Sequence, residues 1–169
     1  MRTALVVVDV QTSLMDRGPW QAEELVAQVT GLVDAARAAG APVVLLTDRR
    51  VQPDPSLHSS LVPQPSDVLV EKGYCDAFLE TPLDAELKAR GVDRLIVCGI
   101  QTDFCVDTTC RSAASHGYEV LLVGNAHSTF DHEYLTAEQI VAHHNRVLRR
   151  LPAGRGSVAV IDAAEVAFA

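Results

Sequence analysis

Leu95-Ile-Val-Cys-Gly-Ile-Gln-Thr-Asp-Phe-Cys-Val-Asp107 joins a strand pattern to a helix pattern through a short polar turn. The apolar run stops at Gly99, and apolar residues recur at helical spacing from Val106 onward. Cys105 therefore lies where a helix is expected to begin. A thiol in the first turn of a helix meets free backbone N–H groups and the positive end of the helix dipole, which favour the thiolate. The position suits a nucleophile, but a lone cysteine is also consistent with a small buried apolar side chain.

Similar apolar runs recur along the chain, and helical patterns separate most of them. The runs are Leu5–Val10, Val43–Thr47, Val68–Val70, Leu95–Cys98, Val120–Val123 and Val158–Ile161. The helical patterns are Ala22–Ala39, Leu83–Arg90, Val106–His116 and Thr136–Arg150. The runs are rich in Val, Ile and Leu without polar alternation, which is typical of parallel strands buried on both faces. The alternation predicts an α/β protein with a three-layer, doubly wound, Rossmann-like sheet of about six parallel strands.

One connection between these elements is unusually long. The segment from Arg49 to Asp67 contains four prolines and shows no clear periodicity. Connections of this length inside a compact domain are commonly functional loops. We therefore expect it to cover the edge of the sheet.

Composition narrows the class of protein. A chain of 169 residues fits a single domain, 1–169. The net charge of −8 and the lack of a basic cluster argue against nucleic acid and anionic membrane surfaces as partners. No signal-peptide pattern and no apolar run of about 20 residues occur, which predicts a cytoplasmic protein. The four cysteines show no CxxC pair or zinc-ligand spacing, so neither a disulfide framework nor a metal is expected.

Three of the apolar runs lead into chemically reactive residues. Asp9 lies near the end of the first run, Lys72 follows the third, and Cys105 follows the fourth. Ligands of open α/β sheets bind beyond the carboxyl ends of the strands, so these side chains are expected at one edge. Taken singly, Asp9 is also consistent with a helix cap and Lys72 with a solvated strand end.

Together, the three groups make a coherent set for acyl transfer. A thiol needs a base or a neighbouring cation before it attacks well at neutral pH. Asp9 is positioned to take the thiol proton, and Lys72 to offset the negative charges. The backbone N–H groups of Gln101 and Cys105 are the expected oxyanion donors. The predicted reaction is attack on a carboxamide carbonyl, loss of an amine, and hydrolysis of a thioester.

These motifs resemble those of the isochorismatase-like cysteine hydrolases, a superfamily that includes nicotinamidases and N-carbamoylsarcosine amidohydrolases. The matching residues are Asp9-Val-Gln11, Lys72 with Ala77-Phe78, and Gly99-Ile-Gln-Thr-Asp-Phe-Cys-Val106 continuing into Thr108, Thr109, Arg111 and Ala113. The similarity covers nearly the whole chain. It implies an isochorismatase-like fold, a catalytic triad of Asp9, Lys72 and Cys105, and a cis peptide bond between Ile100 and Gln101.

Departures from the family bear on cofactors and on the reaction. Nicotinamidases resemble one another in an Asp-x-His metal motif, whereas this chain reads Asp48-Arg49-Arg50. No metal site and no cofactor are therefore expected. Family members that hydrolyse the vinyl ether of isochorismate can lack the cysteine, so the presence of Cys105 favours C–N hydrolysis.

The substrate pocket and the partners are less specified by the sequence. Candidate pocket residues are Gln11, Leu14, Trp20, Tyr74, Phe78 and Phe104. We expect a small-molecule substrate and, by the resemblance, a homo-oligomer of two or more subunits. The histidines at 127, 132, 143 and 144 do not form a recognisable metal or Ser-His-Asp motif.

The sequence thus predicts a cysteine-dependent hydrolase that cleaves a C–N bond of a small carboxamide or ureido compound. Two alternatives stay open on the sequence alone. One is a vinyl-ether hydrolase of the isochorismatase type. The other is a non-enzymatic protein that uses Cys105 as a redox-sensing or ligand-binding thiol.

Overall fold

A computed structural model describes residues 1–149 and 151–168. The strands are β1 Thr3–Val8, β2 Val43–Asp48, β3 Val68–Lys72, β4 Arg94–Ile100, β5 Glu119–Ser128 and β6 Ser157–Ile161. The helices are α1 Thr12–Asp16, α2 Ala22–Ala38, α3 Leu83–Ala89, α4 Asp107–Ser115 and α5 Ala137–Leu148, with a π-helical turn η1 at Thr102–Val106 and a 3-10 turn η2 at Ala163–Glu165.

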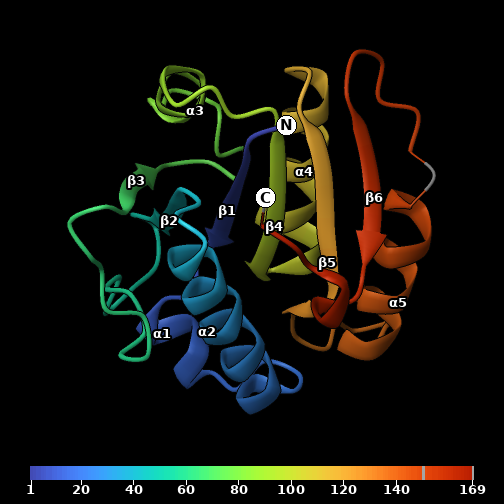
Figure 1. Cartoon of the computed structure of the whole chain (residues 1–169). Helices are drawn as coiled ribbons and strands as arrows, with labels where there is room; N and C mark the ends of the chain where they lie inside the picture. The colour runs from blue at the N-terminus through green and yellow to red at the C-terminus, as the bar shows by residue number, and fades with distance from the viewer. Residues whose placement is uncertain (150, 169) are drawn as a thin grey trace.

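Within the described residues, the strands form one parallel sheet in the order β3-β2-β1-β4-β5-β6. The chain builds outward from β1 in one direction and from β4 in the other, so the strand order reverses between these two neighbours (Figure 1). This confirms the predicted doubly wound α/β fold. The reversal point is where such sheets bind ligands, beyond the carboxyl ends of the strands.

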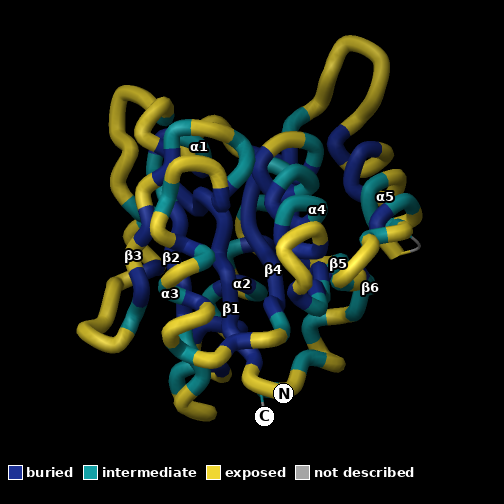
Figure 2. The backbone as a smooth tube through the Cα atoms, turned by 90° about the horizontal axis from the view of Figure 1, so that it is seen from above, coloured by how far each residue is buried: buried dark blue, intermediate teal, exposed yellow. Residues whose placement is uncertain are grey.

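Helices cover both faces of the sheet and bury a separate core on each. One core receives Leu25 and Val29 from α2. The other receives Leu87 from α3, Ala113 from α4 and Leu148 from α5. Figure 1 shows α2 in front of the sheet and α4 behind it, and Figure 2 shows the buried backbone concentrated in the central strands. No helix of the described chain is both long and apolar enough to span a membrane.

Three strands differ from their predicted form. The edge strand β3 alternates in burial, with Leu69 60% exposed, because it lacks a neighbour and a helix layer on one side. The prediction that every run is buried on both faces is wrong for this strand and for the other edge strand, β6, in which Val158 is the one buried residue. The first strand ends at Val8 rather than Val10, since Asp9 adopts a φ of 49° and turns the chain out of the sheet.

The helical predictions also need adjustment. Helical backbone after β4 begins at Thr102 with η1, four residues before the predicted start, because apolar spacing does not reveal a π-helical turn. The short helix α1 has no counterpart among the predicted helices. The last pattern yields α5, for which Thr136 forms a capping box with Gln139; the predicted end at Arg150 lies outside the described residues.

Gly99 permits the close approach of β4 to β1 at the reversal point. Its φ is +120°, and a Cβ placed on it would lie 2.1 Å from the carbonyl oxygen of Val8. Any other side chain at this position would push the two strands apart. The glycine that ends the apolar run in the sequence is thus a requirement of the packing beside the pocket.

Candidate active site

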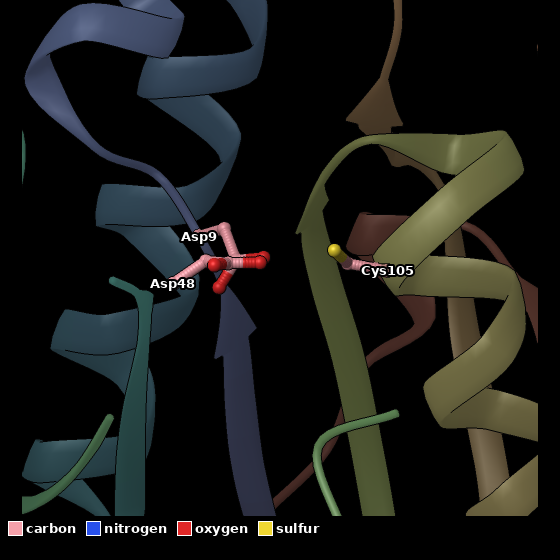
Figure 3. A group of neighbouring side chains, drawn as sticks. All are labelled: Asp9, Asp48 and Cys105. Carbon is pink, nitrogen blue, oxygen red and sulfur yellow. The ribbon is translucent and has the colours of Figure 1, made fainter. Parts of the chain in front are cut away.

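Four neighbouring strands deliver one side chain each to the carboxyl edge of the sheet. Asp9 follows β1, Asp48 ends β2, Lys72 ends β3, and Cys105 lies in the η1 turn that follows β4. Figure 3 shows the carboxylates of Asp9 and Asp48 side by side, with the sulfur of Cys105 facing them. The predicted triad residues are therefore brought together, and Asp48 joins them.

The ammonium group of Lys72 is the centre of this cluster. Its Nζ lies 2.7 Å from Asp9 Oδ2 and 3.1 Å from the sulfur of Cys105. It also donates hydrogen bonds to Asp48 Oδ2 at 3.1 Å and to the carbonyl oxygen of Tyr74 at 3.0 Å. Burial disfavours the charged amine, but the interactions of Lys72 with Asp9 and Cys105 together outweigh burial and raise the pKa of Lys72 above its usual value. Lys72 is thus a fully buried, permanently charged cation rather than a solvated strand end.

Asp9 combines deep burial with an unused acceptor. Its Oδ2 pairs with Lys72, while Oδ1 is buried without a hydrogen-bond partner among the described residues. Burial raises the pKa of Asp9 from its ordinary value near 3.8, and Lys72 only partly opposes that effect. A carboxylate with a raised pKa and a free oxygen is suited to accept a proton from a neighbouring donor.

Cys105 differs electrostatically from the sequence-based expectation. Burial raises the pKa of its thiol, the carboxylate of Asp9 raises it further, and Lys72 opposes both. The direction of this shift is opposite to the thiolate preference expected at the start of a helix, and burial is its largest cause. The resting group is a neutral thiol, which needs a base before it can attack.

Asp48 is a site residue that the sequence reasoning missed, although the signal is present in the sequence. It directly follows the second apolar run, much as Asp9 lies near the end of the first, and it lies opposite Lys72 in the register of β2 and β3. Burial acts to raise the pKa of Asp48, but hydrogen bonds from the side chain and backbone of Arg50, together with the ammonium of Lys72, outweigh it and lower the pKa to about 2. Gln11 holds the backbone of Asp48 through both its amide oxygen and its amide nitrogen.

Three of these side chains also have the chemistry of metal ligands. One potential ligand atom from each of Asp9, Asp48 and Cys105 lies within 4.8 Å of the others. The ammonium of Lys72, however, is in direct contact with all three groups. A second cation in the same place would be repelled, so the donor set does not fit a metal ion.

A pocket of about 430 Å³ opens onto the cluster. Its lining comes from the strand ends, α1, η1 and the long connection after β2; the residues are Asp9, Ser13, Leu14, Arg17, Asp48, Arg50, Val51, Gln52, Cys75, Ile100, Gln101, Phe104 and Cys105. Leu14 and Phe104 line it as the sequence predicts. The long connection supplies three lining residues and is pinned to α1 by a bridge between Gln11 and Leu57.

Four other predicted pocket residues lie elsewhere. Gln11 is fully buried beneath the pocket lining, where it braces the backbone of β2. Phe78 packs in a core and stacks on His116, with ring centroids 4.6 Å apart. The side chain of Tyr74 is exposed, and Trp20 lines a separate small hollow. The sequence marks aromatic residues as pocket candidates, but it does not show which way their side chains point.

The backbone beside Cys105 has the cis geometry that the resemblance implies. The peptide bond between Ile100 and Gln101 is cis, and both residues line the pocket. Gln101 and Cys105 thus line the same pocket. Their backbone N–H groups stay the predicted oxyanion donors.

His127 has a structural role near the site. Its Nε2 donates to Asn145 Oδ1, and its Nδ1 accepts from Thr102 Oγ1, which fixes a neutral tautomer. The amide nitrogen of Asn145 donates to the carbonyl of Gly124, so the orientation of the amide is set. Burial lowers the pKa of His127 to about 4. This histidine braces η1 against β5 and lies outside the pocket.

The fold and the buried Asp9, Lys72 and Cys105 cluster beside a pocket at the strand reversal define a small α/β protein with a candidate active site. The chain matches the family model for the isochorismatase domain over residues 3–148. It belongs to the isochorismatase family.

Three comparisons illustrate this membership. A streptothricin hydrolase from Streptomyces noursei is 38% identical over 138 residues, which cover 76% of this chain and 50% of that protein. A ureidoacrylate amidohydrolase from Stutzerimonas stutzeri is 28% identical over 170 residues, which cover 73% of this chain and 68% of that protein. A solved cysteine hydrolase from Pseudomonas syringae has a TM-score of 0.87 and 27% identity, with 97% of this chain and 90% of that one covered. The chain spans about half the length of two matching streptothricin hydrolases, 50% and 55%.

Proposed function

We propose that this hydrolase cleaves a C–N bond of a small carboxamide or ureido compound through a thioester on Cys105. The observation that carries the proposal is the position of Lys72, whose ammonium lies 3.1 Å from the sulfur and 2.7 Å from Asp9. A buried carboxylate and thiol joined by one cation form a nucleophile, a base and a charge balance in one cluster.

In the first half of the reaction, Asp9 accepts the thiol proton as the sulfur of Cys105 attacks the carbonyl carbon. The electron pair of the carbonyl moves onto its oxygen, and the N–H groups of Gln101 and Cys105 donate to the oxyanion. When the oxyanion collapses, the C–N bond breaks and Asp9 returns its proton to the leaving nitrogen. The products of this half are a free amine or ammonia and a thioester.

In the second half, water attacks the thioester carbonyl while Asp9 accepts a proton from the water. The C–S bond breaks, and the sulfur leaves as a thiolate beside the ammonium of Lys72. Proton transfer from Asp9 then regenerates the thiol, and a carboxylic acid or carbamic acid is released. Lys72 stays charged throughout, and its positive charge lowers the electrostatic cost of the negative groups in a buried site.

The relatives support this class of reaction. One is named an amidohydrolase, and one solved neighbour is described as a cysteine hydrolase. A vinyl-ether hydrolase of the isochorismatase type is the rival, because it needs no cysteine nucleophile. The two differ in whether turnover depends on the sulfur of Cys105.

The test is a screen of small primary amides and ureides for ammonia release, followed by Cys105→Ala on the best substrate. We expect kcat to fall by at least about a thousandfold with the fold retained. Intact-mass analysis of the native enzyme with a slow substrate should show an acyl adduct on Cys105. Cys110→Ala, which removes a thiol from the core rather than the pocket, is the matched control. Normal amide turnover by Cys105→Ala, or pyruvate release from isochorismate that survives this change, would overturn the proposal.

A further inference from the structure

The charges at the active-site pocket do not cancel. Four charged side chains line it: Asp9, Arg17, Asp48 and Arg50. Lys72 adds a fifth charge, and its ammonium pairs with Asp9, while Arg50 donates to both carboxylate oxygens of Asp48. The guanidinium of Arg17 has no ion pair and no hydrogen bond within residues 1–149 and 151–168. The site therefore carries one uncompensated positive charge, and Arg17 is its source.

The unpaired positive charge of Arg17 is opposite in sign to the net charge of the chain. The protein has a formal net charge of −8, so an unpaired cation at a pocket is a local departure from its overall charge. The thiol of Cys105 does not balance it, because burial raises the pKa of that group and keeps it neutral. An incoming anion would complete the charge balance.

Contact with an aromatic ring holds Arg17 in place. Its guanidinium carbon lies 4.4 Å from the ring centroid of Phe130, and Phe130 in turn packs against a core. A cation–π contact of this kind restricts a long side chain without consuming its hydrogen-bond donors. A side chain restricted by such a contact loses less rotamer entropy when it binds an anion.

Arg50 is a weaker candidate for the same task. Its Nε and one terminal nitrogen already donate to Asp48, so its charge is balanced within the protein. The pocket lining also includes apolar side chains, among them Leu14, Val51 and Phe104. A ligand that fits this lining has an anionic end, a short apolar body and a reactive carbonyl.

We propose that the substrate is an amide or ureide bearing a carboxylate or similar anionic group, and that Arg17 recognises this group. The inference rests on the proposed function for the position of the reacting carbonyl. Planar guanidinium donors match a carboxylate with two parallel hydrogen bonds, so Arg17 determines specificity without touching the reacting atoms.

The test uses two thiol probes that differ only in charge, 3-maleimidopropanoate and 3-maleimidopropanamide. Rates of labelling at Cys105 are followed by peptide mass spectrometry in a Cys75→Ser background, which removes the other thiol of the pocket lining. The ratio of the acid rate to the amide rate should fall about tenfold in Arg17→Gln. Arg155→Gln, which removes an exposed positive charge in the connection before β6, should leave the ratio unchanged.

The same comparison applies to turnover, with N-carbamoyl-β-alanine and propylurea as a matched pair of ureides. Arg17→Gln should lower kcat/KM for the acid about tenfold more than for the neutral compound, mainly through KM. Equal probe ratios in the native enzyme and Arg17→Gln would overturn the inference. Because labelling needs no turnover, a charge-dependent ratio without hydrolysis of any amide would instead reject the proposed function alone.

Discussion

The floor and the rim of the pocket are built on different principles. We define the floor as Asp9, Asp48, Lys72 and Cys105, and the rim as Arg17, Arg50, Val51, Gln52 and Phe104. Floor side chains are all buried, and they lie at strand ends or in the turn after β4. Rim side chains come from the residue that follows α1, from the connection after β2 and from η1. Among the described residues, the two floor carboxylates share Lys72, Asp48 also pairs with Arg50 of the rim, and Arg17 is the rim cation that has no ionic partner. This difference predicts that a floor substitution affects kcat while a rim substitution affects selectivity.

Among substitutions of the charged floor residues, Lys72→Met should have the largest combined effect on activity and stability. It leaves the buried carboxylates of Asp9 and Asp48 without their shared cation, so Asp9 would hold a proton at neutral pH and lose its role as a base. We expect kcat to fall by about a thousandfold or more.

The same change tests the electrostatics of the fold. Breaking a buried ion pair from one side costs about 3 kcal/mol of unfolding free energy, measurable by urea denaturation at pH 7. Lys88→Met is the matched control, because Lys88 pairs with Asp84 on the surface and its side chain is 64% exposed. It should change stability by less than about 1 kcal/mol. If Lys72→Met kept kcat within tenfold of the native value, the floor residues would not have the proposed catalytic role.

The pH dependence of kcat/KM should come from the floor and not from the rim. Asp9 must be ionised to accept the thiol proton, and burial raises its pKa above 3.8. Activity should therefore fall about tenfold per pH unit below an apparent pKa higher than that of a free aspartate. Asp48, which Arg50 holds at a pKa of about 2, stays ionised throughout this range.

The pH dependence of stability should have the opposite sign to that of activity, because proton binding is linked to folding. Because the folded state binds a proton at Asp9 more readily than the unfolded state does, ionisation of Asp9 destabilises the fold as pH rises from 3.8 through the raised pKa. Asp9→Asn should abolish this decline together with turnover. An acid limb with an apparent pKa at or below 3.8 would exclude Asp9 as the general base.

The floor was largely predictable from the sequence. Asp9, Lys72 and Cys105 follow apolar runs, and parallel strands bring their carboxyl ends to one edge, so periodicity alone indicates their proximity. The same logic extends to Asp48, whose place at the end of an apolar run is a signal independent of any metal motif around it. The burial of the floor side chains was not predictable from the sequence, since the burial of Lys72 depends on helices and loops that cover it.

The rim could not be derived in this way. Val51 and Gln52 reach the pocket because the long connection folds back onto α1, through contacts such as the hydrogen bond from the Asp54 N–H to Ser13 Oγ. No short-range pattern encodes such contacts between loops. Phe104 and Phe78 look alike in sequence, yet one lines the pocket and the other stacks in a core.

Asp48→Asn should have the smallest effect of the floor changes, and it separates a positioning role from a structural one. The variant removes a like charge that helps to raise the pKa of Asp9. The acid limb of kcat/KM should therefore move to lower pH. Asp9 becomes a weaker base and Lys72 loses one ionic partner, so kcat should fall by about three- to tenfold.

Arg50→Gln gives the matching change on the rim. Arg50 is half exposed, and its loss would raise the pKa of Asp48 from about 2 while Lys72 still favours the carboxylate. Asp48 then stays ionised near neutral pH. The acid limb of the kcat/KM profile, which depends on the pKa of Asp9, should therefore keep its position. A merely structural role for Asp48 would lower kcat without moving the limb. If Arg50→Gln moved the limb as far as Asp48→Asn does, floor and rim would form one electrostatic unit and the distinction between them would fail.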